Sequence, residues 1–114
     1  MRIPTLLALM TLTFGFATAS DAACDYPSQV KIPPGKTATE AEITATSATV
    51  KKYLADLDAY MKCIDAESAA VPVEEQTDES KALHVKRYNA AVDAMEAAAA
   101  AFNTELRAYK AAHP

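Results

Sequence analysis

No glycine occurs between Glu40 and Pro114, and Pro72 is the only proline inside that stretch, while alanine is abundant. Glycine and proline interrupt helices, and alanine is the best helix former. The composition therefore predicts one helix on each side of Pro72, at about residues 37–69 and 74–111. These two helices would make up a single helical unit covering residues 37–114.

The predicted helix starts carry capping signals. Thr37 with Glu40, or Thr39 with Glu42, places glutamate three residues after a threonine, which is the capping-box pattern. The second helix should begin between Pro72 and Asp78, in a stretch that is rich in carboxylates. Because carboxylates stabilise the positive end of a helix dipole, we interpret this acidic cluster as a solvated helix start rather than a metal site.

Both predicted helices carry an apolar stripe with the alternating spacing of three and four that is typical of coiled coils. The two stripes match as an antiparallel hairpin, because seven pairs of stripe residues have numbers that add to 149. The pairs are Ile64 with Val85, Met61 with Tyr88, Leu57 with Val92, Leu54 with Met95, Val50 with Ala99, Ser47 with Phe102 and Ile43 with Leu106. The predicted fold class is all-α, an antiparallel two-helix hairpin resembling a coiled coil; pairing of the stripes between two chains is the alternative.

The only cysteines, Cys24 and Cys63, are predicted to form a disulfide. Cys63 would lie about 39 Å along a helix that begins at Thr37. The 13 steps from Cys24 to Thr37 reach roughly 40 to 43 Å as an extended chain. Residues 23–36 are therefore predicted to run antiparallel to the first helix as an extended strap, which their prolines favour.

A strap needs a groove, and angular placement at about 100° per residue provides one. Two tyrosines of the first helix and four alanines of the second fall on flanks that open on the same side. The residues of this possible strap or partner groove are Tyr53, Tyr60, Ala91, Ala94, Ala98 and Ala101. The alanines would let a third segment approach closely, although good helix propensity alone also accounts for them. The tyrosines are more consistent with core and strap contacts than with a binding stripe.

Residues 1–22 have the pattern of a cleavable signal peptide: Arg2, a short apolar run, then small residues. Cleavage after Ala19 or after Ala22 fits the small-x-small rule. The run is short for a membrane span, which disfavours a retained anchor helix. We therefore expect an exported protein, periplasmic or secreted, with no membrane span after signal removal. Acylation of Cys24 is an alternative, disfavoured by Asp21 at the position where a lipobox requires an apolar residue.

The charge and the scarcity of chemical motifs exclude several function classes. A net charge of −4 without a basic run predicts no nucleic-acid partner. Gly35 is the only glycine after the signal peptide, so no phosphate-binding glycine loop is possible. His84 and His113 are the only histidines, and Ser80 with His84 lacks a third orienting group. We expect no catalytic residue, cofactor or metal site, and no enzyme.

A further pattern runs from the first cysteine into the first helix and resembles a set of small exported helical-hairpin proteins of proteobacteria that carry no assigned function. The matching residues are Cys24, Tyr26, Pro27, Ile32, Pro33, Gly35, Ala38, Thr39, Glu42, Val50, Lys51, Tyr53, Tyr60, Cys63, Ile64 and Glu67. This resemblance implies a location in the bacterial envelope and supplies no catalytic residues.

Two functions fit these expectations best. The first is a periplasmic module that presents a helical face to an unknown protein partner in the cell envelope. The second is a client-binding or stress-protective protein similar to small periplasmic chaperones. An enzyme or metal carrier is a third, disfavoured by the motifs above. The sequence leaves open whether the chain is a monomer or a dimer.

Overall fold

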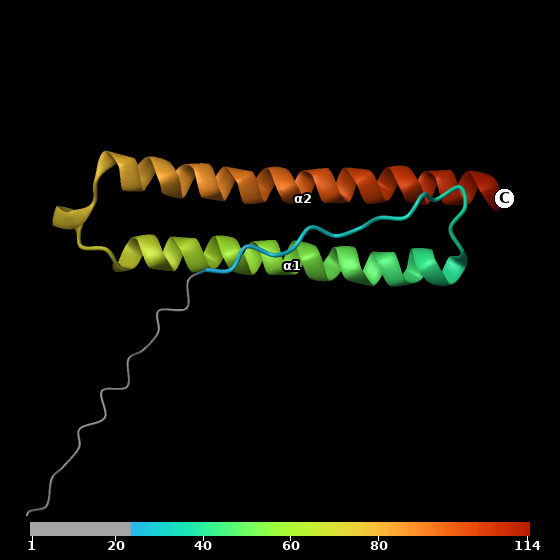
Figure 1. Cartoon of the computed structure of the whole chain (residues 1–114), viewed down its shortest axis with the longest axis horizontal. Helices are drawn as coiled ribbons and strands as arrows, with labels where there is room; N and C mark the ends of the chain where they lie inside the picture. Colours follow the sequence, from blue (N-terminus) through green and yellow to red (C-terminus); the bar gives the residue numbers. More distant parts are fainter. Residues whose placement is uncertain (1–23) are drawn as a thin grey trace, which may run out of the picture.

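The computed structural model describes residues 24–114, so the predicted signal peptide lies outside the described residues. Two long helices, α1 (Glu40–Ala70) and α2 (Asp78–Ala112), lie side by side in opposite directions. A short 3-10 helix, η1 (Val73–Glu75), lies in the connection between them. The N-terminal segment runs along the pair as an extended strap, defined here as residues 24–34 (Figure 1). The structure confirms the predicted fold class.

Helix α1 begins with the second of the two predicted capping boxes. The Thr39 hydroxyl accepts a hydrogen bond from the Glu42 amide at 3.1 Å, and the Glu42 carboxylate accepts one from the Thr39 amide at 2.7 Å. The helix begins later than Thr37 because the preceding residues form a turn, in which the Ala38 amide donates to the Pro34 carbonyl at 3.1 Å. Its end at Ala70 is explained by Pro72, which disfavours helical geometry at Val71.

Helix α2 begins at Asp78, the last residue of the predicted range from Pro72 to Asp78 and later than residue 74, because the acidic stretch after Pro72 first forms η1. The N-cap is Thr77, whose hydroxyl accepts a hydrogen bond from the Ser80 amide at 3.0 Å. The Ser80 hydroxyl accepts one from the Thr77 amide at 3.0 Å. Asp78 and Glu79 occupy the first turn, where the helix dipole favours negative charge.

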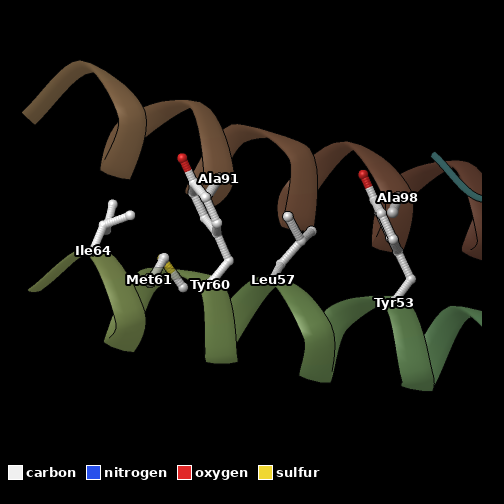
Figure 2. Packing of buried hydrophobic residues seen from close by; sticks show 7 residues of the cluster. All are labelled: Tyr53, Leu57, Tyr60, Met61, Ile64, Ala91 and Ala98. Carbon is white, nitrogen blue, oxygen red and sulfur yellow. The ribbon is translucent and has the colours of Figure 1, made fainter. Parts of the chain in front are cut away.

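The core lies between the two helices and beneath the strap. Large side chains come mainly from α1, and Leu57 and Ile64 are almost completely buried. Figure 2 shows Tyr53 and Tyr60 reaching from α1 across to α2, where Ala98 and Ala91 are buried. Bulky residues of one helix therefore face small residues of the other, which allows close packing.

The structure differs from the predicted seam in the rotation of α2. Val85 and Tyr88, expected to face Ile64 and Met61, are 55% and 36% exposed, whereas Ala91 is fully buried. The axial register agrees better with the prediction, because His84 contacts Asp65, a pair whose numbers also add to 149. The strap supplies the physical reason for the rotation. It adds a third wall to the core, and α2 turns its alanine flank toward that wall and toward the tyrosines of α1.

The strap does not follow α1 for its whole length. It starts beside Cys63 in the C-terminal half of α1 and crosses toward the C-terminal end of α2 before it turns back into α1 (Figure 1). At that end Gly35 is buried, and its amide donates a hydrogen bond to the Glu105 carboxylate at 2.6 Å. The strap therefore joins both helices. Its longer path is possible because α1 begins at Glu40, which shortens the distance along the helix to Cys63 to about 35 Å.

Candidate functional site

The disulfide predicted from the two cysteines is present. Cys24 and Cys63 are bonded, with their Cα atoms 5.7 Å apart, and 39 positions separate them in sequence. Cys63 lies in the second half of α1, so the bond fixes the start of the strap to the side of this helix. The side chains of Cys24 and Val30 pack against the buried core cluster. The strap is thus held by a covalent bond and by apolar contacts.

The six residues of the predicted groove lie along this strap, at different depths. Tyr53, Tyr60, Ala91 and Ala98 are buried, Ala94 is half-buried, and Ala101 is exposed. Val30 and Ile32 of the strap share the lining of one hollow with Tyr53 and the alanines Ala94, Ala97, Ala98 and Ala101. The strap therefore lines one hollow together with these four alanines, which we call the alanine shelf. That a partner protein uses the same groove stays a prediction.

The strap leaves a shallow hollow on each of its two sides. The hollow toward α2 has a volume of about 330 Å³ and is lined by strap residues, Tyr53 and the alanine shelf. The hollow toward α1 has a volume of about 520 Å³ and is lined by strap residues with Thr49, Lys52, Tyr53 and Asp56. Both are open depressions between the strap and a helix. Neither is the deep, enclosed apolar pocket that small-molecule ligands generally require.

Polar and aromatic side chains surround the disulfide. The Tyr26 ring meets the Tyr60 ring edge-on, with centroids 5.1 Å apart. The Arg87 guanidinium of α2 donates to the Tyr60 hydroxyl at 3.0 Å and lies 3.4 Å from the Glu67 carboxylate. The other carboxylate oxygen of Glu67 lies 3.3 Å from the Cys24 sulfur. These contacts connect the strap to both helices at the disulfide.

Two of these groups have shifted pKa values. The hydrogen bond from Arg87 to Tyr60 raises the pKa of the guanidinium, which is charged at any ordinary pH in any case. Partial burial, with a smaller contribution from Tyr53, raises the pKa of the Tyr26 phenol, so this phenol stays neutral. The cluster therefore places one fixed cation, Arg87, beside the Tyr60 hydroxyl and the Glu67 carboxylate. This arrangement suits the holding of a strap rather than proton transfer near neutral pH.

Sequence reasoning did not identify the roles of Arg87 and Glu67. The signal available in the sequence was the spacing of the residues that Arg87 contacts. Tyr60 and Glu67 lie two turns apart on the flank of α1 that carries Cys63. The rotation of α2 then decides which of its cations reaches that flank. Because the predicted seam was rotated relative to the real one, Arg87 was assigned no partner.

The serine and histidine near the start of α2 have structural partners. The Ser80 hydroxyl donates to the Thr77 carbonyl at 2.9 Å and belongs to the capping box. His84 Nε2 lies 3.0 Å from the Asp65 carboxylate across the hairpin. Within residues 24–114, no cluster of three or more histidine, cysteine, aspartate or glutamate side chains is placed to hold a metal ion.

An apolar surface lies at the hairpin end that contains η1. Val71, Val73 and Leu83 are 37%, 81% and 55% exposed, and we call these three residues the tip surface. Val71 and Leu83 line a small hollow of about 130 Å³ together with Ile64, His84 and Arg87. The connection protrudes beyond the ends of both helices (Figure 1). This end of the rod therefore offers apolar groups to solvent beside charged ones.

The fold defines a class: a helical hairpin with a disulfide-tied strap. No family model matches the sequence, and neither a curated protein nor a solved structure matches it. In the described part of the chain, neither helix combines the length and the hydropathy needed to span a membrane. The function is therefore argued from the surface of this chain alone.

Proposed function

We propose that this protein is an exported interaction module that acts by binding a partner protein through its tip surface rather than by catalysis. The observation that carries the proposal is the exposure of Val71, Val73 and Leu83 together at one end of the rod. Grouped apolar residues on an otherwise polar surface are typical of protein-binding sites, whereas single exposed ones are ordinary.

The rest of the architecture supports this proposal. A helix of 31 residues is about 46 Å long, so the paired helices hold the tip well away from the other end of the rod. The disulfide joins the strap to α1, and the Arg87 contacts join α1 to α2 beside it. A binding surface on such a stiff support loses little conformational entropy when a partner docks.

Export is the second part of the proposal. The signal-peptide pattern of residues 1–22 supports it, and an intrachain disulfide is compatible with an oxidising compartment such as the periplasm. N-terminal sequencing of the protein recovered from a bacterial envelope fraction tests this part. We expect a first residue of Ala23 or Ser20. An intact N-terminus, recovered only from the cytoplasm, would overturn export without touching the binding proposal.

Affinity capture from an envelope extract tests the tip surface. The wild-type protein should retain one stoichiometric partner, and Val73→Asp combined with Leu83→Asp should reduce that retention at least tenfold. Ala48→Asp combined with Ala100→Asp is the matched control, because these residues are also exposed but lie away from the tip surface. Equal retention by the tip variant and the control would overturn the proposal. Retention of many unfolded proteins would instead favour the chaperone-like alternative.

A further inference from the structure

One apolar stripe of α2 is left outside the hairpin core. Val85 and Tyr88 are exposed and Val92 is half-buried, although all three belong to the coiled-coil spacing of this helix. The rotation of α2 that buries Ala91 and Ala98 leaves Val85 and Tyr88 at the surface, whereas Val92 packs at the edge of the core cluster. The hairpin therefore leaves two of these coiled-coil positions exposed and covers the third only in part.

This stripe faces away from the strap and ends in opposite charges. At about 100° per residue, the side chains of Lys81, Val85, Tyr88, Val92 and Glu96 fall within an arc of about 80° on α2. We call these five residues the open face. Lys81 and Glu96 are both exposed. The strap contacts the alanine shelf, whose members Ala94 and Ala101 lie on roughly the opposite side of the helix.

The open face is complementary to itself in antiparallel orientation. In an antiparallel pair of α2 helices, residues at equal height have numbers that add to a constant. One such register places Val85 opposite Val92 of the partner subunit. The same register places Lys81 opposite Glu96 of the partner subunit. It places Tyr88 at the two-fold axis, next to Tyr88 and Asn89 of the partner subunit. Apolar groups then meet at the centre, and unlike charges meet at both ends.

We propose that the open face binds a second copy of this chain, forming a two-fold symmetric dimer with antiparallel α2 helices. A symmetric interface uses the same patch on both subunits, so the patch must be self-complementary. Lys81 and Glu96 satisfy this requirement, because each meets the opposite charge in the other copy. The inference goes beyond the proposed function and does not use Val71, Val73 or Leu83.

The size of the open face sets the expected affinity. The distance from Lys81 to Glu96 is about 22 Å along the helix. A contact of this length and about one helix width covers roughly 220 Å² per subunit, well below the 800 Å² or so of a standard interface. The dimer should therefore be weak and form only at high protein concentration.

Sedimentation equilibrium of the oxidised protein between about 10 μM and 1 mM tests this dimer. Lys81→Glu and Glu96→Lys, made singly, each create two like-charge contacts per dimer and should each raise the dissociation constant at least tenfold. The double variant with both changes restores unlike charges in both pairs and should recover most of the affinity. A merely structural role of these exposed residues would not produce this rescue.

The matched control is Lys86→Glu combined with Asp93→Lys, because these exposed residues of α2 lie outside the open face. The control should dimerise like the wild type. Circular dichroism of each variant verifies folding, and Val85→Asp should abolish the dimer in a folded protein. A monomer throughout the concentration range would overturn the proposal. So would a dimer whose dissociation constant is unchanged by the single reversals, or single reversals that are not rescued by the double variant.

Discussion

Gly35, which directly follows the strap, makes a close contact with α2. A Cβ atom added to Gly35 would overlap the carbonyl group of Glu105 and would lie 2.9 Å from the amide nitrogen of Tyr109. Both are backbone atoms of a continuous helix, which cannot move aside as a side chain can. Only glycine fits here, because the space for a side chain is missing.

Gly35→Ala should therefore lower the free energy of unfolding by about 1 to 3 kcal/mol, the usual range for overpacking a close contact. Urea denaturation measures this change. Lys36→Ala is the neighbouring control at an exposed position of the same turn, and it should change stability by less than about 0.5 kcal/mol. Equal stability of Gly35→Ala and the control would show that the strap does not press on α2 at this point.

At the scale of the helices, α2 contributes small side chains to a core that α1 fills with large ones. Ala91 is fully buried and lies on the side of α2 that Tyr60 reaches (Figure 2). The run of alanine in α2 thus permits the approach of α1 and of the strap together. Long unbranched residues have nearly as good a helix propensity as alanine, but close approach of another segment requires a small side chain.

Ala91→Leu should destabilise the protein by about 1 to 3 kcal/mol, because the helix contact has no space for the three additional side-chain carbon atoms. Ala100→Leu is the matched control at an exposed position of the same helix and should be close to neutral. Thermal unfolding followed by circular dichroism compares the two variants. Similar melting temperatures would contradict the packing role of the alanine flank.

The helices and their pairing could be predicted from the sequence, because both depend on local signals. Helix content follows from the absence of glycine, and the capping box at Thr39 follows from residue spacing. The predicted axial register of the two helices also agrees with the contact between Asp65 and His84. These signals act within one helix or between two adjacent ones.

The rotation of α2 could not be predicted in the same way. A spacing of three and four in the sequence fits more than one helix face, and the strap decides which face is buried. Arg87 and Glu105 obtain their partners only through this three-way packing. The two seam residues Val85 and Tyr88 were therefore assigned to the core although they lie on the surface.

At the scale of the whole molecule, the strap makes a stable unit out of two helices that share a narrow contact. The disulfide connects residues 39 positions apart, and in the chain-entropy account a loop of this size stabilises the fold by about 4 kcal/mol. This is a large fraction of the total stability expected for a small domain. The tip surface and the open face both depend on the hairpin that the strap secures.

The most direct test of this account is the free energy of unfolding of the protein in urea, with and without a thiol reductant. Reduction should lower it by about 4 kcal/mol, because the strap loses its covalent attachment to α1. A variant with both Cys24→Ser and Cys63→Ser should already have the lower value and should not respond to the reductant. An unchanged free energy of unfolding after complete reduction of the wild-type protein would contradict the account.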